Sequence, residues 1–527
     1  MTALARITAV NGTLFIDELG RSRIFRGTNV VVKTPPYVPD TSTASVSLMS
    51  FNENDAAVLA QYGVTAIRLG IMWPGVEPTE GNYNQTYLDE MAKIVQFCSD
   101  VGIYVLLDFH QDILSERFCG EGVPSYIIDT NSQANSGSEG FPIPLQSTAY
   151  SVNADKIPSE ANCSSKVWGL YSTADAVGYA YDQLYNNKNN VRDYFIAYWK
   201  LVAETFLPFT NILGYDMINE PFFGDVNADP SIASASLANQ NNLQPFYDFV
   251  SAAIRSVDSN AIIHFESVTL IQEYDYFTKV PGGPDYAKQS TTIGFRVASA
   301  NALGCGVFLG EFEMGYGTAG STIPSIQNAL DAVDYNLISA TGWEYKDYIT
   351  PGDYIITGTN NGLIDPSTGS VRLDMAAAFS RTYAHTIAGI PTAMCFDNTT
   401  STFALKFQFN GNTGLSGTTE LRTNFDVIYP KGFSVNISTS VGGSGGFSTQ
   451  YSNNSIFIIP SSNGGKNFAK NQSIVSVFVT SNSAATVESR CVQYLITTAS
   501  SSNAVAGLMP FSSILLGFLL VLHYLLL

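Results

Sequence analysis

The sequence predicts an α/β fold, a (β/α)8 TIM barrel followed by a C-terminal antiparallel β-sandwich. Apolar strand patterns alternate with helical patterns from about residue 20 to residue 390, which is typical of a parallel barrel. Two of these strand patterns stop directly at a glutamate, Glu220 and Glu311, and barrels of this type carry their functional groups at the strand ends. After Pro391 the pattern changes to short alternating strands separated by Gly- and Ser-rich turns, which favours a sandwich.

The barrel strands can be placed in order along the chain, with one weak position. The clear candidates are residues 24–27, 66–69, 104–107, 212–218, 262–265, 307–309 and 342–345. Only about 45 residues separate His264 from Leu309, although two barrel units of roughly thirty residues each have to fit there. One weak candidate, Thr291–Phe295, lies in that interval. We therefore expect seven clear strands and one doubtful one.

The chain divides into three predicted parts. Residues 1–390 form the barrel, residues 391–495 form the sandwich and residues 496–527 form a separate apolar tail. The stretch from Leu107 to Ile212 is far too long for one barrel unit, so we expect a large insertion at about residues 108–190. The insertion follows a strand end and is rich in Ser, Asn and Gly, which makes it a candidate lid over the functional face.

Composition limits the classes of partner. The chain of 527 residues has a formal net charge of −19, which disfavours nucleic acid and anionic lipid as ligands and fits a neutral ligand. It contains only four histidines, and no metal-binding histidine cluster, phosphate-binding loop or Ser-His-Asp arrangement stands out. We therefore expect no metal and no cofactor.

The cysteine count permits a disulfide framework. Six cysteines allow three disulfides in fifteen possible connectivities. Cys119 and Cys163 fall within the insertion and could staple it, whereas Cys395 and Cys491 bracket the sandwich and could close it. Buried free thiols are an alternative, above all for the remaining pair, Cys98 and Cys305.

The C-terminal tail indicates attachment to a membrane. Residues 508–527 are almost wholly apolar and follow a short stretch of small polar residues, which is typical of a glycolipid-anchor signal; a tail-anchored transmembrane helix is the alternative. The chain carries several Asn-X-Ser/Thr triplets, yet residues 1–9 show no secretory segment. We therefore expect an extracellular or cell-surface protein whose true start lies upstream of Met1.

The two glutamates indicate a class of chemistry. Glu220 stands in Asn219-Glu220-Pro221 after one strand, and Glu311 follows Gly310 after another. Two carboxylates that face one bond are the machinery of glycoside hydrolysis. Arg68, Trp343 and the string His110-Gln111-Asp112 also follow or end predicted strands.

Taken in order, these strings resemble the family-five glycoside hydrolases, and within them the endoglycoceramidases and related glucosylceramidases. The resemblance covers most of residues 20–490. Further matching strings are Asn29–Tyr37, Trp73–Pro78, Trp199–Phe206, Val280–Gly283 and Glu344–Lys346.

The resemblance implies a role for each candidate residue. Glu220 is similar to the general acid/base and Glu311 to the nucleophile of a retaining mechanism. Asn219 is similar to the residue that hydrogen-bonds the sugar 2-hydroxyl, and Arg68 would keep the nucleophile ionised. The expected sugar contacts are Lys33, His110, Asp112, the stacking platform Trp343 and, by a looser match, Trp168.

The sequence departs from the family pattern in two places. The family has a His-Tyr-Tyr-type strand before the nucleophile strand, where this chain has Gln289–Phe295 with neither residue. Glu313 also adds a carboxylate two residues after Glu311, which could raise the pKa of the nucleophile.

We expect a retaining β-glycosidase that cleaves between a β-linked sugar or glycan and ceramide in glycosphingolipids. The alternatives are a family-five β-glucanase acting on polysaccharide, or a catalytically impaired cell-surface protein that binds carbohydrate or glycolipid.

Overall fold

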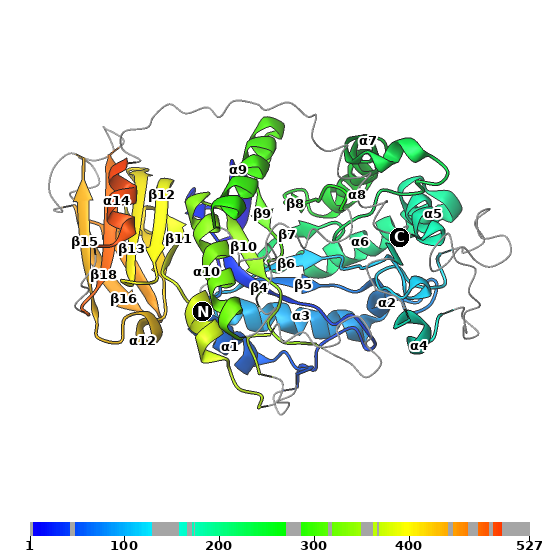
Figure 1. Ribbon diagram of the computed structural model, residues 1–527, viewed down its shortest axis with the longest axis horizontal. Helices are drawn as coiled ribbons and strands as arrows, with labels where there is room; N and C mark the ends of the chain where they lie inside the picture. The colour runs from blue at the N-terminus through cyan, green and yellow to red at the C-terminus, as the bar shows by residue number, and fades with distance from the viewer. Residues whose placement is uncertain are drawn as a thin grey trace.

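The computed structural model describes residues 4–42, 48–128, 157–165, 171–172, 174–269, 286–312, 314, 319–348, 362–365, 368–440, 446–461, 473–483 and 488–497. Figure 1 shows two parts side by side, a parallel sheet wrapped by helices and a set of antiparallel sheets next to it. This confirms the predicted fold class, a barrel-type α/β part followed by a sandwich.

The first part is built on a parallel sheet of seven strands in the order β8-β7-β6-β5-β4-β10-β9. All its pairings are parallel, and its central strands are buried on both faces, as expected where helices cover a sheet. The strands are β4 Arg26–Val30, β5 Ala66–Gly70, β6 Tyr104–Asp108, β7 Ile212–Asp216, β8 Ile263–His264, β9 Phe308–Leu309 and β10 Ser339–Gly342.

Helices connect these strands and cover the sheet (Figure 1). Their buried faces are rich in Leu, Ile, Val and aromatic residues, which form one continuous core with the strands. The helices are α1 Glu53–Gln61, α2 Trp73–Val76, α3 Gln85–Asp100, α4 Glu160–Cys163, α5 Asp175–Tyr185, α6 Val191–Phe206, α7 Ala235–Ala238, α8 Gln244–Val257, α9 Tyr286–Leu303, α10 Ala319–Tyr335 and α11 Leu373–Phe379.

The doubtful sixth strand is a helix, so the prediction of a strand at Thr291–Phe295 was wrong. These residues lie inside α9. Ile293 is 3% exposed and Phe295 is 68% exposed, although a strand would turn both side chains to one face. Val297, four residues after Ile293, packs against the same core, so the apolar spacing is helical. Within the described residues, β8 and β9 form the two edges of the sheet.

The second part consists of two antiparallel sheets packed around their own core. One sheet has the order β1-β2-β3-β11-β14-β17-β16, and the other has the order β12-β13-β18-β15. The strands are β1 Ile7–Asn11, β2 Leu14–Asp17, β3 Ser22–Arg23, β11 Tyr383–Ile387, β12 Gly389–Asp397, β13 Thr402–Phe409, β14 Thr419–Arg422, β15 Phe433–Thr439, β16 Phe447–Ser452, β17 Ser455–Pro460 and β18 Ile474–Ser481. The N-terminal strands thus belong to this sheet, because Arg23 and Ser22 of β3 pair with Thr386 and Ile387 of β11.

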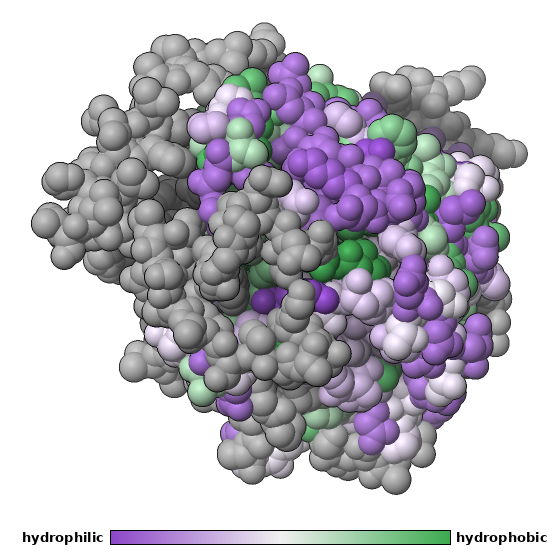
Figure 2. Space-filling view, turned by 90° about the vertical axis from the view of Figure 1, so that its right-hand side faces the viewer, coloured by the Kyte–Doolittle hydropathy of each residue, from purple (hydrophilic) through white to green (hydrophobic). Residues whose placement is uncertain are grey.

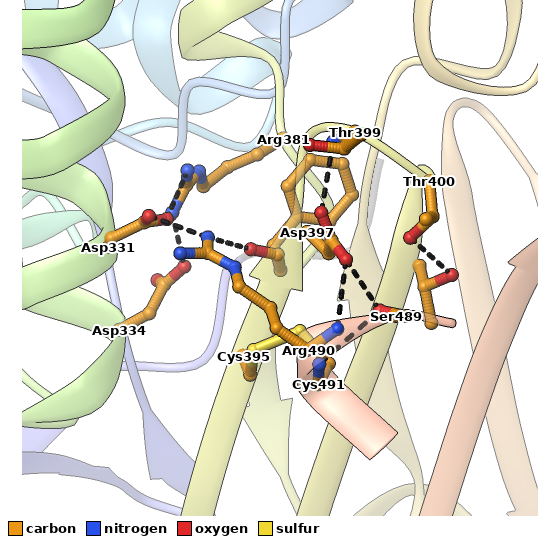
Figure 3. The surroundings of a disulfide bond; sticks show 12 residues. Asp331, Asp334, Arg381, Cys395, Asp397, Thr399, Thr400, Ser489, Arg490 and Cys491 are labelled. Atoms are coloured by element: carbon orange, nitrogen blue, oxygen red, sulfur yellow. Dashed lines mark hydrogen bonds and ion pairs between the residues drawn. A yellow bond between two sulfur atoms is a disulfide. The ribbon is translucent and has the colours of Figure 1, made fainter. Parts of the chain in front are cut away.

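The two parts meet along helix α10, which contacts β12 of the sandwich. Figure 3 shows charged side chains gathered at this junction. Asp334 of α10 accepts hydrogen bonds from Arg26 and Arg381, each at 2.7 Å. Asp331, one turn earlier, binds Arg381 at 2.7 Å and Arg490 at 2.6 Å. The start of β4, the helix α10 and the sandwich are therefore joined by one network of ion pairs.

Both of the suggested disulfides are confirmed. Cys119 and Cys163 form a disulfide within the insertion, and Cys395 and Cys491 form a second one between β12 and helix α14 Arg490–Thr497 (Figure 3). The other two cysteines are free thiols. None of the described helices is long and apolar enough to cross a membrane. The predicted tail, residues 508–527, lies outside the described residues.

Candidate active site

A fully buried guanidinium organises the ends of the parallel strands. Arg68 of β5 is 0% exposed and points its nitrogens at oxygen acceptors from several neighbouring elements. Burial alone would lower the pKa of Arg68, but the surrounding carboxylates raise it well above its ordinary value. The acceptors within hydrogen-bond distance are Asn29 at 3.3 Å, Asp108 at 2.9 Å, Asp216 at 2.8 Å, Asn219 at 2.9 Å and Glu311 at 2.6 Å. Of the two glutamates predicted to react, Glu311 is therefore held directly by Arg68.

Glu220 is held by its backbone in a turn just after β7. Its φ of 37° lies in the left-handed region, which is uncommon for a residue with a side chain. Gln111 Nε2 donates to the carbonyl oxygens of Asn219 at 2.5 Å and Glu220 at 3.1 Å, and Tyr181 in turn donates to Gln111 Oε1 at 2.7 Å. The Glu220 amide donates to Glu266 Oε2 at 3.0 Å. Glu220 is thus held in position through its main-chain carbonyl and amide groups.

The two glutamates have different electrostatic surroundings. Burial, followed by the charges of Glu311 and Asp112, raises the pKa of Glu220 to about 8. Glu311 instead forms an ion pair with Arg68 at 2.6 Å, and its side chain is 31% exposed. A carboxyl that keeps its proton near neutral pH and a carboxylate held by an arginine are the two states that an acid and a nucleophile require.

Strand β9 and the segment after it carry Glu311 into the site. A Cβ atom on Gly310 would lie 3.7 Å from Arg68 Nε, so the backbone passes close to the guanidinium. The carbonyl of Gly310 accepts hydrogen bonds from Asn29, at 3.1 Å, and from Thr341. Glu313, whose charge was expected to affect Glu311, lies outside the described residues.

A second polar cluster lies beside the glutamates. Lys33 forms ion pairs with Asp112 and, at 3.2 Å, with Glu121. His110 Nδ1 lies at hydrogen-bond distance from Asp108 Oδ2, 2.9 Å, and His110 Nε2 lies 3.7 Å from Asp112 Oδ2. All of these side chains are buried. Such a group of preset donors and acceptors suits the binding of sugar hydroxyls.

The protonation states within this cluster follow from Lys33. Burial would lower the pKa of Lys33, but Asp112 and Glu121 raise it well above its ordinary value. Burial opposes ionisation of Asp112, yet the Lys33 ammonium and His110 hold its pKa below the usual range. Burial raises the pKa of Glu121, which the charge of Asp112 reinforces. The cluster is thus an ammonium–carboxylate pair beside a carboxyl group that favours its proton.

The cluster also contains ligand types that bind metals. The ligand atoms of His110, Asp112 and Glu121 lie within 4.8 Å of one another. The Lys33 ammonium lies among them and supplies a positive charge to both carboxyl groups. The positive charge of Lys33 therefore lies where a bound cation would otherwise balance these carboxyl groups.

Trp343 lies over this cluster. Its ring stacks on His110 with centroids 5.2 Å apart and an interplanar angle of 19°, and the Lys33 ammonium lies 4.9 Å from its centroid. The Trp343 amide donates to the carbonyl of Phe312 at 2.8 Å, next to Glu311 in sequence. The side chain is half-buried, so part of the ring remains accessible to a ligand.

The structure brings eight of the nine predicted site residues together. These are Lys33, Arg68, His110, Asp112, Asn219, Glu220, Glu311 and Trp343. The ninth, Trp168, lies outside the described residues. Their individual catalytic and binding roles stay predictions.

Two acidic residues of the site were missed. Glu266 follows β8 in the same way that Glu220 follows β7, so the signal that identified two glutamates also applied to a third. Glu121 gave no comparable signal. It reaches the cluster because residues 112 and 121 form an antiparallel bridge within the insertion, which no sequence pattern predicts.

Comparisons with known proteins place the chain in a family. The model of the cellulase family, glycosyl hydrolase family 5, matches residues 38–348, and the model of the glycoside hydrolase family 5 C-terminal domain matches residues 381–474. An endoglycoceramidase of Cyanea nozakii is 35% identical over 80% of this chain and 85% of its own length. An endoglycoceramidase of Hydra vulgaris is 34% identical over 80% of this chain and 81% of its own length.

Solved structures share the fold. Endo-glycoceramidase II from Rhodococcus sp., in a complex with ganglioside GM3, matches with a TM-score of 0.64 and 20% identity over 90% of this chain and 100% of that chain. An endogalactoceramidase matches with a TM-score of 0.61 and 18% identity over 91% of this chain and 100% of that chain. At these identities the likeness establishes the architecture of both parts.

Proposed function

Because this chain belongs to glycoside hydrolase family 5, we propose that it is a retaining β-glycosidase that hydrolyses the bond between a β-linked sugar or glycan and ceramide in glycosphingolipids. The observation that carries the proposal is the contrast between its two glutamates. Glu220 retains a proton because its pKa is raised to about 8, whereas Glu311 is paired with Arg68 at 2.6 Å. Two relatives that are similar over most of their length carry the name endoglycoceramidase.

In this mechanism Glu311 attacks the anomeric carbon and forms a covalent glycosyl-enzyme. Glu220 gives its proton to the glycosidic oxygen so that ceramide leaves as the neutral alcohol. Glu220, now ionised, then takes a proton from water, which attacks the same carbon and releases Glu311. The sugar keeps its β configuration because the carbon is inverted twice.

The remaining side chains orient the sugar. Asn219 is fixed by Arg68 at 2.9 Å and is proposed to hydrogen-bond the 2-hydroxyl. Lys33, His110 and Asp112 are proposed to bind further hydroxyls, and Trp343 to stack beneath the ring. Binding that fixes the sugar lowers the barrier because the reacting groups no longer have to find one another.

The lipid part of the substrate requires apolar surface near the glutamates. Phe265, which directly precedes Glu266, is 48% exposed, and Phe222 next to Pro221 is half-buried. Figure 2 shows the face opposite the sandwich, where a compact group of hydrophobic residues lies among hydrophilic ones. Exposed aromatic residues at the strand ends support a site that accepts an apolar leaving group.

The test uses a pair of variants and a substrate panel. Glu220→Gln and Glu311→Gln should each lower the release of ceramide from glucosylceramide or a longer glycolipid by at least about 10³-fold. Ceramide is measured by mass spectrometry, and β-glucan serves as the comparison substrate. Undiminished turnover in either variant would refute the assignment, and faster hydrolysis of β-glucan than of glycolipid would favour a polysaccharide-degrading enzyme.

One observation favours a second function, binding without turnover. Helix α9 occupies the stretch where the family pattern has a strand with a histidine and a tyrosine. If this difference removes activity, the wild-type chain should bind glycolipid with no release of ceramide.

We further propose that the protein acts at the cell surface and is attached through its C-terminal tail. The apolar residues 508–527 and the Asn-X-Ser/Thr triplets support this location. Two disulfides also fit an oxidising compartment. Release of the protein from cells by a phosphatidylinositol-specific phospholipase would identify a glycolipid anchor, whereas retention would favour a transmembrane tail.

A further inference from the structure

We propose that Glu266 is a positioning residue for the acid/base group: its carboxyl group accepts a hydrogen bond from the Glu220 amide and thereby fixes Glu220 relative to Arg68 and Glu311. This inference rests on the proposed function of the same site. It assigns a role to a third glutamate, one that follows the short strand β8.

The direct contact is a hydrogen bond between neighbouring loops. The Glu220 amide donates to Glu266 Oε2 at 3.0 Å. Glu220 has a φ of 37°, a conformation that a residue with a side chain keeps only when its surroundings enforce it. A second bond, from the Thr269 amide to the Pro221 carbonyl at 2.8 Å, joins the same two loops. The turn that presents Glu220 is therefore tied to the segment after β8 at two points.

Glu266 is itself held in place. The Tyr247 hydroxyl donates to the carbonyl oxygen of Glu266 at 2.8 Å. The Val268 amide donates to Asn239 Oδ1 at 2.9 Å. These bonds come from helix α8 and the turn before it, so the segment is anchored to the core of the first part of the molecule. An anchored acceptor can hold the Glu220 turn, whereas a free one could not.

Arg68 connects Glu266 to the nucleophile. Glu266 Oε1 lies 3.7 Å from Arg68 Nη2, and Arg68 Nη1 lies 2.6 Å from Glu311 Oε1. One buried guanidinium thus contacts both the nucleophile and the side chain that holds the acid/base turn. A chain of three contacts therefore links the two reacting carboxyl groups, from Glu311 through Arg68 and Glu266 to the Glu220 amide.

Glu266 acts through another residue, so its loss should impair one part of the reaction more than others. Proton donation matters most when the leaving group is a poor one, such as an alkoxide, and little when it is a good one, such as a nitrophenolate. Misplacement of Glu220 should therefore reduce cleavage of alkyl glycosides selectively. A general loosening of the fold would reduce cleavage of both kinds of substrate to the same degree.

Two conservative variants test whether the length of the Glu266 side chain or its ability to ionise is what matters. Glu266→Asp keeps the charge but is one methylene shorter, so it withdraws the acceptor from the Glu220 amide. Glu266→Gln keeps the length of the side chain and an acceptor oxygen but cannot ionise. The proposal predicts that Glu266→Asp is impaired and that Glu266→Gln is largely rescued. Glu204→Gln, at an exposed position on α6, is the control for loss of one carboxylate.

The experiment measures kcat/KM of the full chain for an alkyl and a dinitrophenyl β-glycoside of the same sugar, because kcat/KM reports the first step for both. Glu266→Asp should lose about 10- to 100-fold on the alkyl glycoside and less than about threefold on the aryl glycoside. Equal losses on both substrates, no loss on either, or a Glu266→Gln variant as impaired as Glu266→Asp would each overturn the proposal. Thermal unfolding verifies that each variant is folded.

The same measurements separate this inference from the function on which it rests. If the wild type hydrolyses neither glycoside nor glycolipid, the proposed function fails and the role of Glu266 fails with it. If the wild type is active and only the selectivity of Glu266→Asp is absent, the hydrolase assignment stands and Glu266 is structural.

Discussion

The two ends of the parallel sheet each contain a buried arginine surrounded by carboxylates, but their charge balance differs. At the end where the strands stop, Arg68 forms ion pairs with four described acidic residues, Asp108, Asp216, Glu266 and Glu311. At the end next to the sandwich, the ion pairs made by helix α10 join three arginines to two aspartates, namely Arg26, Arg381 and Arg490 to Asp331 and Asp334.

This difference separates a reactive cluster from a structural one. A surplus of carboxylates around one guanidinium makes their full ionisation unfavourable. Burial and the charge of Asp108 raise the pKa of Asp216 to about 6, although Arg68 opposes this. Burial and Glu311 raise the pKa of Glu220 to about 8. Surplus negative charge keeps carboxyl groups protonated where a reaction can use the proton, whereas a network with more arginines than aspartates only joins elements.

The largest effect is expected from removing each central arginine. Arg68→Met should lower kcat/KM by about 10²- to 10³-fold, because Glu311 and Asn219 lose the group that orients them. Arg381→Met removes an equally buried guanidinium from Asp331 and Asp334, and should lower the free energy of unfolding by about 3–5 kcal/mol while kcat/KM of the folded protein is unchanged. Urea denaturation and steady-state kinetics measure the two effects.

These variants test whether the two ends of the sheet have different roles. If Arg381→Met reduced kcat/KM as much as Arg68→Met does, the sandwich-side network would be coupled to the reaction. If Arg68→Met retained activity, the guanidinium would not be needed to hold the nucleophile.

A smaller comparison lies within the sandwich-side network. Asp334 is 1% exposed and bridges two arginines, so Asp334→Asn should cost about 3–5 kcal/mol of unfolding free energy. The side chain of Arg490 is 49% exposed, and Arg490→Gln should cost at most about 1 kcal/mol. Denaturant titration at low and high salt measures both, and only the Arg490 contribution should fall with added salt. Similar losses of unfolding free energy for the two variants would contradict the expectation that burial decides how much each ion pair contributes.

The two disulfides allow a further comparison of the same ends. The Cys119–Cys163 bond closes a separation of 44 residues and the Cys395–Cys491 bond one of 96 residues. Replacing either pair by serine should therefore cost about 3–5 kcal/mol, slightly more for the longer loop. Only the Cys119/Cys163 pair stands beside Glu121, which contacts Lys33 at 3.2 Å. Its loss should also raise KM, as steady-state kinetics would measure.

A rise in KM for both double variants, or for neither, would contradict this separation. In the first case the sandwich would influence the site, and in the second the Glu121 turn would hold without its disulfide.

Much of the fold and the site was predictable because its signals are local. A strand that ends at Glu220 or Glu311 can be recognised from a few residues, and so can the pairing of Cys119 with Cys163 inside one insertion. The strand expected at Thr291–Phe295 failed because only packing against the core reveals that Ile293 is buried and Phe295 exposed.

The contacts that could not be predicted cross between distant segments. The N-terminal strands join the sandwich through a pairing of β3 with β11, more than 350 residues apart in sequence. Glu121 reaches Lys33 through a turn of the insertion. Glu266 was within reach, because it ends a predicted strand as the two recognised glutamates do, yet its bond to the Glu220 amide depends on the left-handed turn.

A last effect is expected on the pH dependence of stability. The pKa of Glu220 is raised from 4.5 to about 8 in the folded chain, so between these pH values the folded state keeps a proton that the unfolded state has lost. The free energy of unfolding therefore falls as pH rises through this window. Glu220→Gln cannot ionise, so its stability relative to wild type should rise from about pH 5 to about pH 8. Glu204→Gln, at an exposed position, is the control for loss of one glutamate. Urea denaturation at both pH values measures the difference. A Glu220→Gln difference that did not change with pH would mean that Glu220 is ionised across this window, and the strand-end site would then lack the proton that distinguishes it from the network beside the sandwich.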